Sequence, residues 1–283
     1  FGGQTPPNTA ATEEYNGTSW SGGAVFPTAI YRLGGTGTGT SALGFGGDSP
    51  PGAMSAVTAK YDGTSWTTVP NMGTARRSLG AAGSQTAAVA FGGDANPPIT
   101  NATEEFNSST NVVSAAAWAS ATASNTGRYI ASGVGSNTAC VVYGGVFNPG
   151  TTLRAQTEEW DGSSWTESGD LATARFGIGQ GIGTQTAALA YGGYTTTVVA
   201  NTEEYNGASW TSATSLPAAG RIQGGFGTQT AGVSAAGQGA PGKWTNSYEY
   251  NGASWTSATA YPTAVEQMAG CGTETAGLIT GGS

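Results

Sequence analysis

Short apolar segments that end in glycine doublets are the dominant pattern along this chain. The segment Ala187–Tyr191 is apolar at every position and is followed directly by Gly192-Gly193. A strand with one solvated face alternates between apolar and polar residues, and this segment does not. A short β-strand that is buried on both faces gives such a pattern. The sequence therefore predicts short strands whose two faces are both covered.

The same apolar strand and doublet recur from one end of the chain to the other. The doublets, with Ala236-Gly237 in the sixth place, begin at or near residues 2, 46, 92, 144, 192, 236 and 281. A fixed interval of about 46 residues indicates a repeat architecture, because each repeat is one unit of supersecondary structure.

A second marker lies between successive doublets and reads Glu-Glu-Tyr, then Asn-Gly or Asp-Gly, then Ser-Trp. Its copies span residues 13–20, 60–66, 158–165, 203–210 and 249–255, with a degenerate copy from residue 104. Asn-Gly between strand-forming residues is typical of a two-residue hairpin turn of type I′. We therefore expect Thr202–Tyr205 and Ser209–Ala213 to pair across Asn206-Gly207.

Each repeat also holds a strand of small residues, such as Leu79–Gly83 or Gly224–Gly227. Glycine weakens a strand unless another backbone comes close to it. The innermost strands of a β-propeller converge on its axis, where only small side chains fit. We name the small-residue strand a, the strand before the doublet b, the Glu-Glu-Tyr strand c and the Trp strand d. Strand a is placed at the axis and strand d at the outside.

The Gly-Gly doublet, the Tyr after a variable loop and the Trp shortly beyond it resemble the kelch repeat over essentially the whole chain. The interval from Tyr to Trp is shorter here than in that family. The local variant Thr-Glu-Glu-Tyr-Asn-Gly-x-Ser-Trp, with Gly-Thr-Gln-Thr-Ala-Ala-Leu-Ala-Tyr-Gly-Gly, is similar to repeats in virion proteins of marine bacteriophages. This resemblance implies a virion protein of the fibre, spike or decoration type.

Strand counting predicts an all-β chain that folds as a single six-bladed β-propeller over residues 1–283, with four antiparallel strands in each blade. The chain begins with strands c and d and ends with strands a and b. Pairing of these two ends would close the ring and satisfy the strand edges. The six a strands are expected to start near Arg32, Arg76, Arg128, Arg175, Arg221 and Glu266.

The first residues, Phe1-Gly2-Gly3, duplicate a position that Ile279–Gly282 already fills. We expect from this duplication that the propeller belongs to a longer protein and to a larger assembly.

Propeller geometry places the short a-b and c-d turns on one face and the longer b-c and d-a connections on the other. The b-c connections vary in length and chemistry, and variable loops on a rigid scaffold are where recognition usually occurs. Their apolar residues Phe147, Tyr194 and Trp244 are predicted to contact a ligand. The alternative is that these connections only bridge the blades.

Arginine recurs at the start of strand a in five repeats, at Arg32, Arg77, Arg128, Arg175 and Arg221. A ring of guanidinium groups near the axis would suit an anionic sugar or a phosphate group. The alternative, which we favour, is that each arginine pairs with a neighbouring Glu inside the structure, because buried charges are normally paired.

Composition narrows the classes of function. The chain has a net charge of -8, with 9 Lys and Arg against 17 Asp and Glu, which suits neither nucleic acid nor an anionic membrane. No apolar run approaches the roughly 20 residues of a membrane helix. The hydrophobic fraction of 37% argues against disorder and is enough to build a core.

The sequence contains no histidine, which removes Ser-His-Asp catalysis and His-ligated metal sites. Glu13-Glu14 has a counterpart in other repeats, and this recurrence fits an architectural role better than one glycosidase carboxylate pair. We therefore predict no enzyme activity, no metal and no other cofactor. Cys140 and Cys271 are predicted to be buried free thiols, with a disulfide as the alternative.

These observations lead us to expect a non-enzymatic binding module on a virion surface or in another extracellular location. It would recognise a host-surface glycan or protein through the long-loop face, beside other virion or surface structural proteins. A purely structural, oligomerising particle protein is the first alternative. A carbohydrate-active propeller enzyme, with carboxylates converging in a deep axial pocket, is the second.

Overall fold

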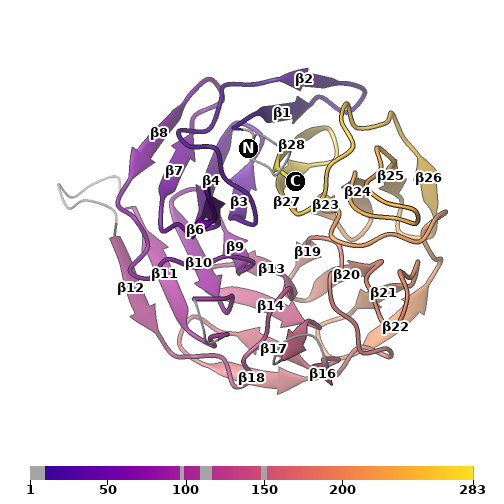
Figure 1. Cartoon of the computed structure of the whole chain (residues 1–283). Helices are drawn as coiled ribbons and strands as arrows, with labels where there is room; N and C mark the ends of the chain where they lie inside the picture. Colours follow the sequence, from indigo (N-terminus) through magenta and orange to yellow (C-terminus); the bar gives the residue numbers. More distant parts are fainter. Residues whose placement is uncertain (1–9, 96–98, 109–116, 148–151, 283) are drawn as a thin grey trace.

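The computed structural model describes residues 10–95, 99–108, 117–147 and 152–282. Six four-stranded antiparallel sheets stand around a common axis, as Figure 1 shows. The fold is an all-β, six-bladed β-propeller, which confirms the predicted fold class. No helix among the described residues is long and apolar enough to cross a membrane.

Five blades follow one another along the chain, each running from the axis outward.
Blade 1 contains β3 (Gly34–Thr38), β4 (Ser41–Phe45), β7 (Thr58–Tyr61) and β8 (Trp66–Val69). Blade 2 contains β9 (Gly80–Gly83), β10 (Ala87–Phe91), β11 (Thr103–Asn107) and β12 (Ala117–Ala121). Blade 3 contains β13 (Ser132–Ser136), β14 (Ala139–Tyr143), β17 (Thr157–Trp160) and β18 (Trp165–Ser168). Blade 4 contains β19 (Ile182–Thr184), β20 (Ala187–Tyr191), β21 (Thr202–Tyr205) and β22 (Trp210–Ala213). Blade 5 contains β23 (Gly224–Thr228), β24 (Ala231–Ala235), β25 (Ser247–Tyr250) and β26 (Trp255–Ser257).

Blade 6 is shared by the two ends of the chain. It contains β27 (Met268–Thr273), β28 (Ala276–Gly281), β1 (Thr12–Tyr15) and β2 (Trp20–Gly22). The register pairs Thr12 with Thr280 and Tyr15 with Gly277. The predicted closure, N-terminal strands c and d against C-terminal strands a and b, is confirmed. The glycine doublet at residues 2–3 lies outside the described residues.

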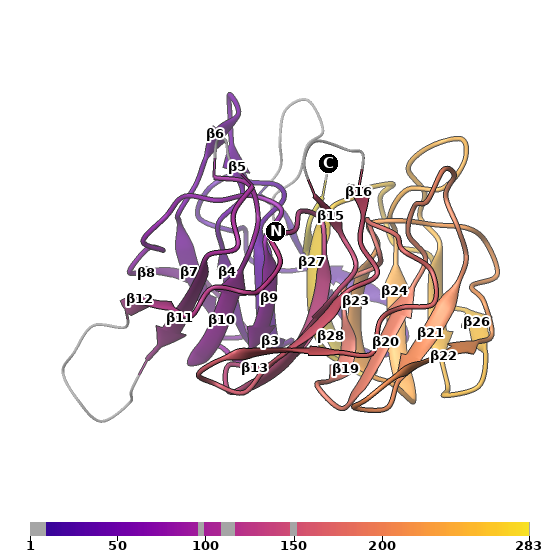
Figure 2. The same cartoon turned by 90° about the horizontal axis from the view of Figure 1, so that it is seen from below.

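Two small hairpins extend the b-c connections, and the strand count had not predicted them. They consist of β5 (Asp48–Ser49) with β6 (Ala53–Met54) in blade 1, and β15 (Val146–Phe147) with β16 (Thr152–Leu153) in blade 3. Figure 2 shows both hairpins on the same face of the disc. We call this side, which carries the b-c and d-a connections, the long-loop face, and the opposite side the short-turn face.

Small residues occupy the axis because the inner strands approach one another closely there. A Cβ atom at Gly181 would lie 2.4 Å from the carbonyl oxygen of Gly133 in the neighbouring blade. A Cβ atom at Gly270 would lie 2.5 Å from the carbonyl oxygen of Gly225. Larger side chains at these positions of strand a would collide with the backbone of the neighbouring blade, as the sequence predicted.

The c-d turn differs from the predicted type I′ hairpin. Tyr205 pairs with Trp210, so the connection has four residues and not two. Within it only Gly207 has a positive φ, of 89°. The side-chain oxygen of Asn206 accepts hydrogen bonds from the N–H groups of Ala208 and Ser209, each at 3.0 Å. An Asx turn of this kind replaces the backbone turn. Asn and Asp both have the side-chain oxygen that this turn needs, which explains why either residue occurs at this position.

The hydrophobic core lies between blades, not within one sheet. One cluster joins Val141 and Tyr143 of blade 3 to Ala188, Ala190 and Tyr205 of blade 4. Strand β20 is buried on both faces, as predicted from its continuous apolar pattern. Side chains also join neighbouring blades. In four blades the indole N–H of the d-strand Trp donates to the hydroxyl of the Thr that begins strand c of the preceding blade, as in Trp255 to Thr202 at 3.0 Å.

Both cysteines are buried free thiols, as predicted. Burial raises the pKa of the Cys271 thiol to about 12 and also raises the pKa of the Cys140 thiol.

Candidate functional site

One residue in each blade, just before the inner strand at the long-loop face, has a left-handed backbone conformation. These residues have φ angles between 49° and 62° and are Arg32, Ser78, Ile130, Gly177, Ile222 and Gln267. Non-glycine residues seldom adopt this conformation, and here every repeat imposes it. Backbone hydrogen bonds run from blade to blade, for example from Ile222 N–H to Gly177 O at 2.7 Å and from Gln267 N–H to Ile222 O at 3.2 Å. We call this ring of six residues the rim.

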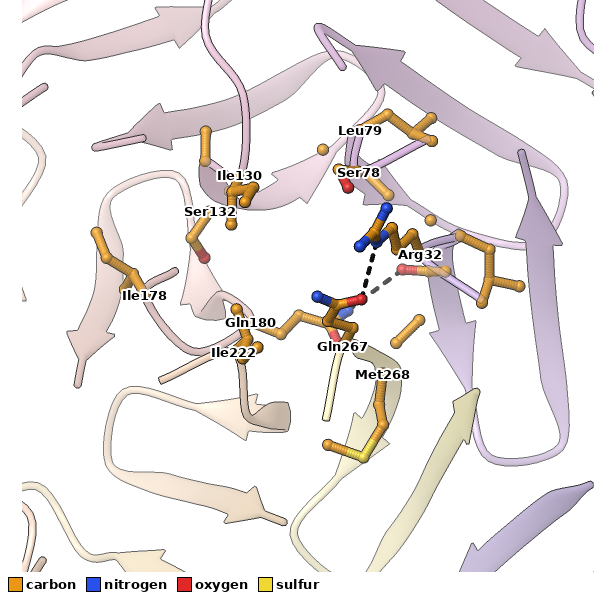
Figure 3. A pocket seen from close by; sticks show the side chains of 18 of the residues that line it. Arg32, Ser78, Leu79, Ile130, Ser132, Ile178, Gln180, Ile222, Gln267 and Met268 are labelled. Atoms are coloured by element: carbon orange, nitrogen blue, oxygen red, sulfur yellow. Dashed lines mark hydrogen bonds between the residues drawn. The ribbon is translucent and has the colours of Figure 1, made fainter. Parts of the chain in front are cut away.

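The rim surrounds a cavity of about 120 Å³ on the propeller axis, which we call the axial cup (Figure 3). Figure 3 places Ile130 and Ile222 on the other side of the cup from Arg32. Arg32 Nε donates a hydrogen bond of 2.9 Å to Gln267 Oε1. The cup thus combines an apolar side with a polar side that is rich in hydrogen-bond donors.

Gln180 forms the floor of the axial cup. Blade 4 has one residue more between its rim residue, Gly177, and its turn glycine, Gly183, than the other blades have. One additional residue makes a β-bulge, which commonly re-aims a side chain. Gln180 Nε2 donates to the carbonyl oxygen of Gly270 at 2.7 Å, and the Gly270 N–H donates to Gln180 Oε1. The Gln180 side chain therefore spans the axis to blade 6.

A second cavity of about 130 Å³ lies on the axis toward the short-turn face, lined mainly by the glycines of the inner strands. Gln180 lines both cavities. The axial cup is consequently blind, open toward the long-loop face and closed by one side chain.

The predicted ring of arginines divides into two sets. Arg128 and Arg175 are buried and form ion pairs with Glu158 and Glu203 of their own blades. Arg76, next to the predicted Arg77, does the same with Glu104 at 2.8 Å. Neither Arg128 nor Arg175 lines the axial cup. For these positions the structure has the arrangement that we favoured, in which arginine pairs with Glu inside the fold.

The second set, Arg32, Arg77 and Arg221, lies at the long-loop face. Arg77 Nη2 is 2.7 Å from Asp94 Oδ2, and both Arg77 and Arg32 approach the buried Asp48, at 3.3 and 3.5 Å. Burial raises the pKa of Asp48, and the two arginines oppose that shift.

Arg221 donates from Nε to Gln238 Oε1, and its guanidinium lies 5.0 Å from the centre of the Tyr194 ring. Of the five predicted arginines, only Arg32 lines the axial cup.

The three predicted aromatic and apolar contact residues lie apart from the cup. Phe147, in the β15–β16 hairpin, is 41% exposed and has the Arg154 guanidinium 5.0 Å from its ring centre. Tyr194 packs on Phe176. Trp244 donates its indole N–H to the carbonyl oxygen of Ala236 at 2.6 Å. The structure thus does not bring these three side chains into one site with Arg32.

Sequence reasoning missed the residues that shape the cup with Arg32, namely Ser78, Ile130, Gln180, Ile222 and Gln267. One signal was present: the segment that ends at the turn glycine Gly183 is one residue longer than its counterparts in the other repeats, and it carries the long polar side chain of Gln180. The rim side chains differ from blade to blade, so no repeating residue marks them.

The described residues that line the axial cup include no Asp or Glu. The described part of the chain also holds no group of three or more Cys, Asp or Glu side chains placed to bind a metal ion. No model of a known protein family matches the sequence, and no curated protein matches it.

Proposed function

We propose that this protein is a non-enzymatic binding module that recognises a glycan or protein on a host cell through its long-loop face. Its kelch-like repeats, and their similarity to repeats in marine bacteriophage virion proteins, support a place on a virion surface as a fibre, spike or decoration protein. Its partners would then be other virion or surface structural proteins and a molecule of the host.

The observation that carries this proposal is the blind axial cup on the long-loop face. Ligand sites are usually concave and largely apolar, with a few polar groups that set orientation. The cup has this character, with Ile130 and Ile222 opposite Arg32. The β5–β6 and β15–β16 hairpins and the other b-c connections occupy the same face and offer further contact surface around the cup.

Both native thiols are buried, so a single introduced cysteine can be labelled selectively with a maleimide-linked polymer. Ala53 is exposed in the β5–β6 hairpin on the long-loop face, and Ala253 is exposed in a c-d turn on the short-turn face. We expect the unlabelled protein to bind marine bacterial host cells or a glycan array. A polymer at Ala53→Cys should abolish this binding, and the same polymer at Ala253→Cys should leave it intact.

Two results would overturn the proposal. One is an unlabelled protein that binds neither cells nor glycans. The other is equal inhibition of binding by the polymer on the two faces, since recognition would then not belong to the long-loop face.

A further inference from the structure

We propose that the axial cup binds the carboxylate of an acidic sugar at the end of a glycan chain, with Arg32 as the residue that recognises the charge. This inference rests on the proposed function and names the ligand class for the same site.

The polar side of the cup presents donors. Gln267 Oε1 accepts the hydrogen bond from Arg32 Nε, so the amide nitrogen of Gln267 remains as a donor. Ser78 adds a hydroxyl group to the same rim. The guanidinium of Arg32 is planar and matches a carboxylate; its Nη1 lies 3.5 Å from Asp48 Oδ2, and its Nη2 has no such contact with Asp48. Such a set of donors favours an anionic group rich in acceptor oxygens.

The charge around the cup leaves Arg32 available. Its contact with Asp48, 3.5 Å, is longer than the 2.7 Å contact between Arg77 and Asp94, and Arg77 approaches Asp48 as well. Asp48 is fully buried, whereas the Arg32 side chain is 26% exposed. A ligand carboxylate in the cup therefore meets the guanidinium and no lining Asp or Glu that would repel it.

The rim favours a sugar over the carboxyl end of a peptide. Proteins often capture a peptide carboxylate with consecutive backbone N–H groups that form a nest. Here the N–H groups of Ser78, Ile222 and Gln267 are already donated to carbonyl groups of the rim. Because most of the rim N–H groups are engaged in this way, the side chains are the main donors of the cup. Ile130 and Ile222 offer apolar contact to the C–H groups of a sugar ring.

The size of the cup sets how much of a glycan enters. A volume of about 120 Å³ is below that of a pocket for a whole drug-sized ligand. Gln180 closes the floor, so a chain cannot thread through the axis. The cup therefore accepts one terminal group.

Glucuronic acid and glucose form a matched pair of probes, because they differ at one carbon, which carries a carboxylate in the first and a hydroxymethyl group in the second. In calorimetric or NMR titrations of the full chain we expect glucuronic acid to bind at least about tenfold more tightly, as the loss of a charged hydrogen-bonded contact implies. Its binding should weaken as salt rises, because ions screen a partly exposed charge pair.

Arg32→Gln tests the residue itself. The chain already carries a glutamine in the same left-handed conformation at Gln267, so this change is compatible with the backbone. We expect it to reduce glucuronic acid affinity about tenfold or more and to remove the salt dependence. Arg221→Gln, on the same face but outside the cup, is the matched control and should bind as the parent does. Thermal unfolding of each variant verifies that it folds.

The outcomes separate the two proposals. Equal affinity for glucuronic acid and glucose, or unchanged binding by a folded Arg32→Gln variant, overturns the carboxylate site even where the protein still binds host cells. Binding of a free peptide carboxyl end with no binding of glucuronic acid overturns the choice of a sugar. Absence of binding to every glycan and to cells overturns the proposed function together with this inference.

Discussion

At the scale of single residues, most blades either contain both members of a buried Arg–Glu ion pair or replace both of them with uncharged residues. Arg175 in blade 4 is buried against Glu203, which also accepts a hydrogen bond from the N–H of Ala172 at 2.7 Å. In blade 1 the corresponding positions are Ile30 and Ala59, which pack in one apolar cluster. An uncompensated buried charge is costly, so the repeats keep both partners or replace both.

Blade 6 is the exception to this rule. Glu13 occupies the Glu position of its c strand, and Val265 stands where other blades have arginine. Burial raises the pKa of Glu13, in line with the lack of an arginine at that position.

The pairing predicts how substitutions in blade 4 combine. Arg175→Ile or Glu203→Ala alone should lower the free energy of unfolding by about 3–5 kcal/mol, because each leaves a buried charge without its partner. The double variant reproduces the Ile30 and Ala59 arrangement of blade 1 and should be more stable than either single variant. Denaturant unfolding of the three variants and the parent measures this. Additive losses in the double variant would contradict the interpretation.

At the scale of elements, the c strands are linked from blade to blade through one side-chain contact. The hydroxyl of Tyr205 donates to Glu159 of the preceding blade at 2.5 Å, and Tyr250 donates to Glu204 at 2.7 Å. Phe106 has no hydroxyl, and there the preceding blade carries Lys60, whose ammonium lies 5.4 Å from the ring centre. In these blades the residue of one c strand thus matches the ring of the next, whereas Trp160 of blade 3 donates its indole N–H to the carbonyl oxygen of Asn137 at 2.8 Å.

The bulge in blade 4 is the element that breaks the symmetry of the ring. Gln180→Ala should leave the backbone N–H and carbonyl of Gly270 without their partner and should join the two axial cavities. We expect the free energy of unfolding to fall by about 1–3 kcal/mol. We also expect hydrogen exchange at the Gly270 amide to become faster.

Gln185→Ala is the matched control for that experiment. Gln185 Nε2 donates to the carbonyl oxygens of Trp160 and Cys140, at 2.8 and 3.2 Å, away from the axial cup. It should lower stability without changing exchange at Gly270. Slow exchange at Gly270 in Gln180→Ala would show that Gln180 does not hold this strand.

At the scale of the whole molecule, β1 and β28 join the two ends of the chain into one blade. The pairing leaves no blade with a free inner or middle strand, and inner strands contact their neighbours all around the ring, β27 with both β23 and β3. The β1–β28 pairing is made at a b-c junction, and each of the other blades has a covalent b-c connection at the same place. We therefore expect that the ring would also close if the chain were opened at another b-c connection.

A circular permutant tests this expectation. Joining residue 283 to residue 1 and opening the chain between the exposed Thr196 and Thr197, in the b-c connection of blade 4, preserves all 24 propeller strands. We expect its free energy of unfolding to stay within about 1 kcal/mol of the parent, since loop length costs little. Deletion of residues 268–283 removes the partners of β1 and should abolish cooperative unfolding. A permutant that fails to fold would contradict closure by strand pairing alone.

The sequence by itself determined the features that are local or periodic. Repetition of the doublet and of the Glu-Glu-Tyr marker predicted the number of blades, the four strands of each and the division of one blade between the chain ends. The two-sided apolar pattern of β20 predicted its burial, and the small residues of strand a predicted the close approach at the axis. These features depend on residues that are near one another in the chain, or on an arrangement that recurs from blade to blade.

Only the tertiary structure decided what each repeat contributes to the axis. Arg32 and Arg175 look alike in sequence, yet Arg32 is a left-handed rim residue in the cup, whereas Arg175 lies two positions before its rim residue, Gly177, and pairs with Glu203. A shift of two positions relative to the rim residue separates a side chain in the cup from a side chain in a buried ion pair, and the pattern of residue types does not reveal it. Gln180 meets Gly270 only because ring closure brings blades 4 and 6 to the same axis.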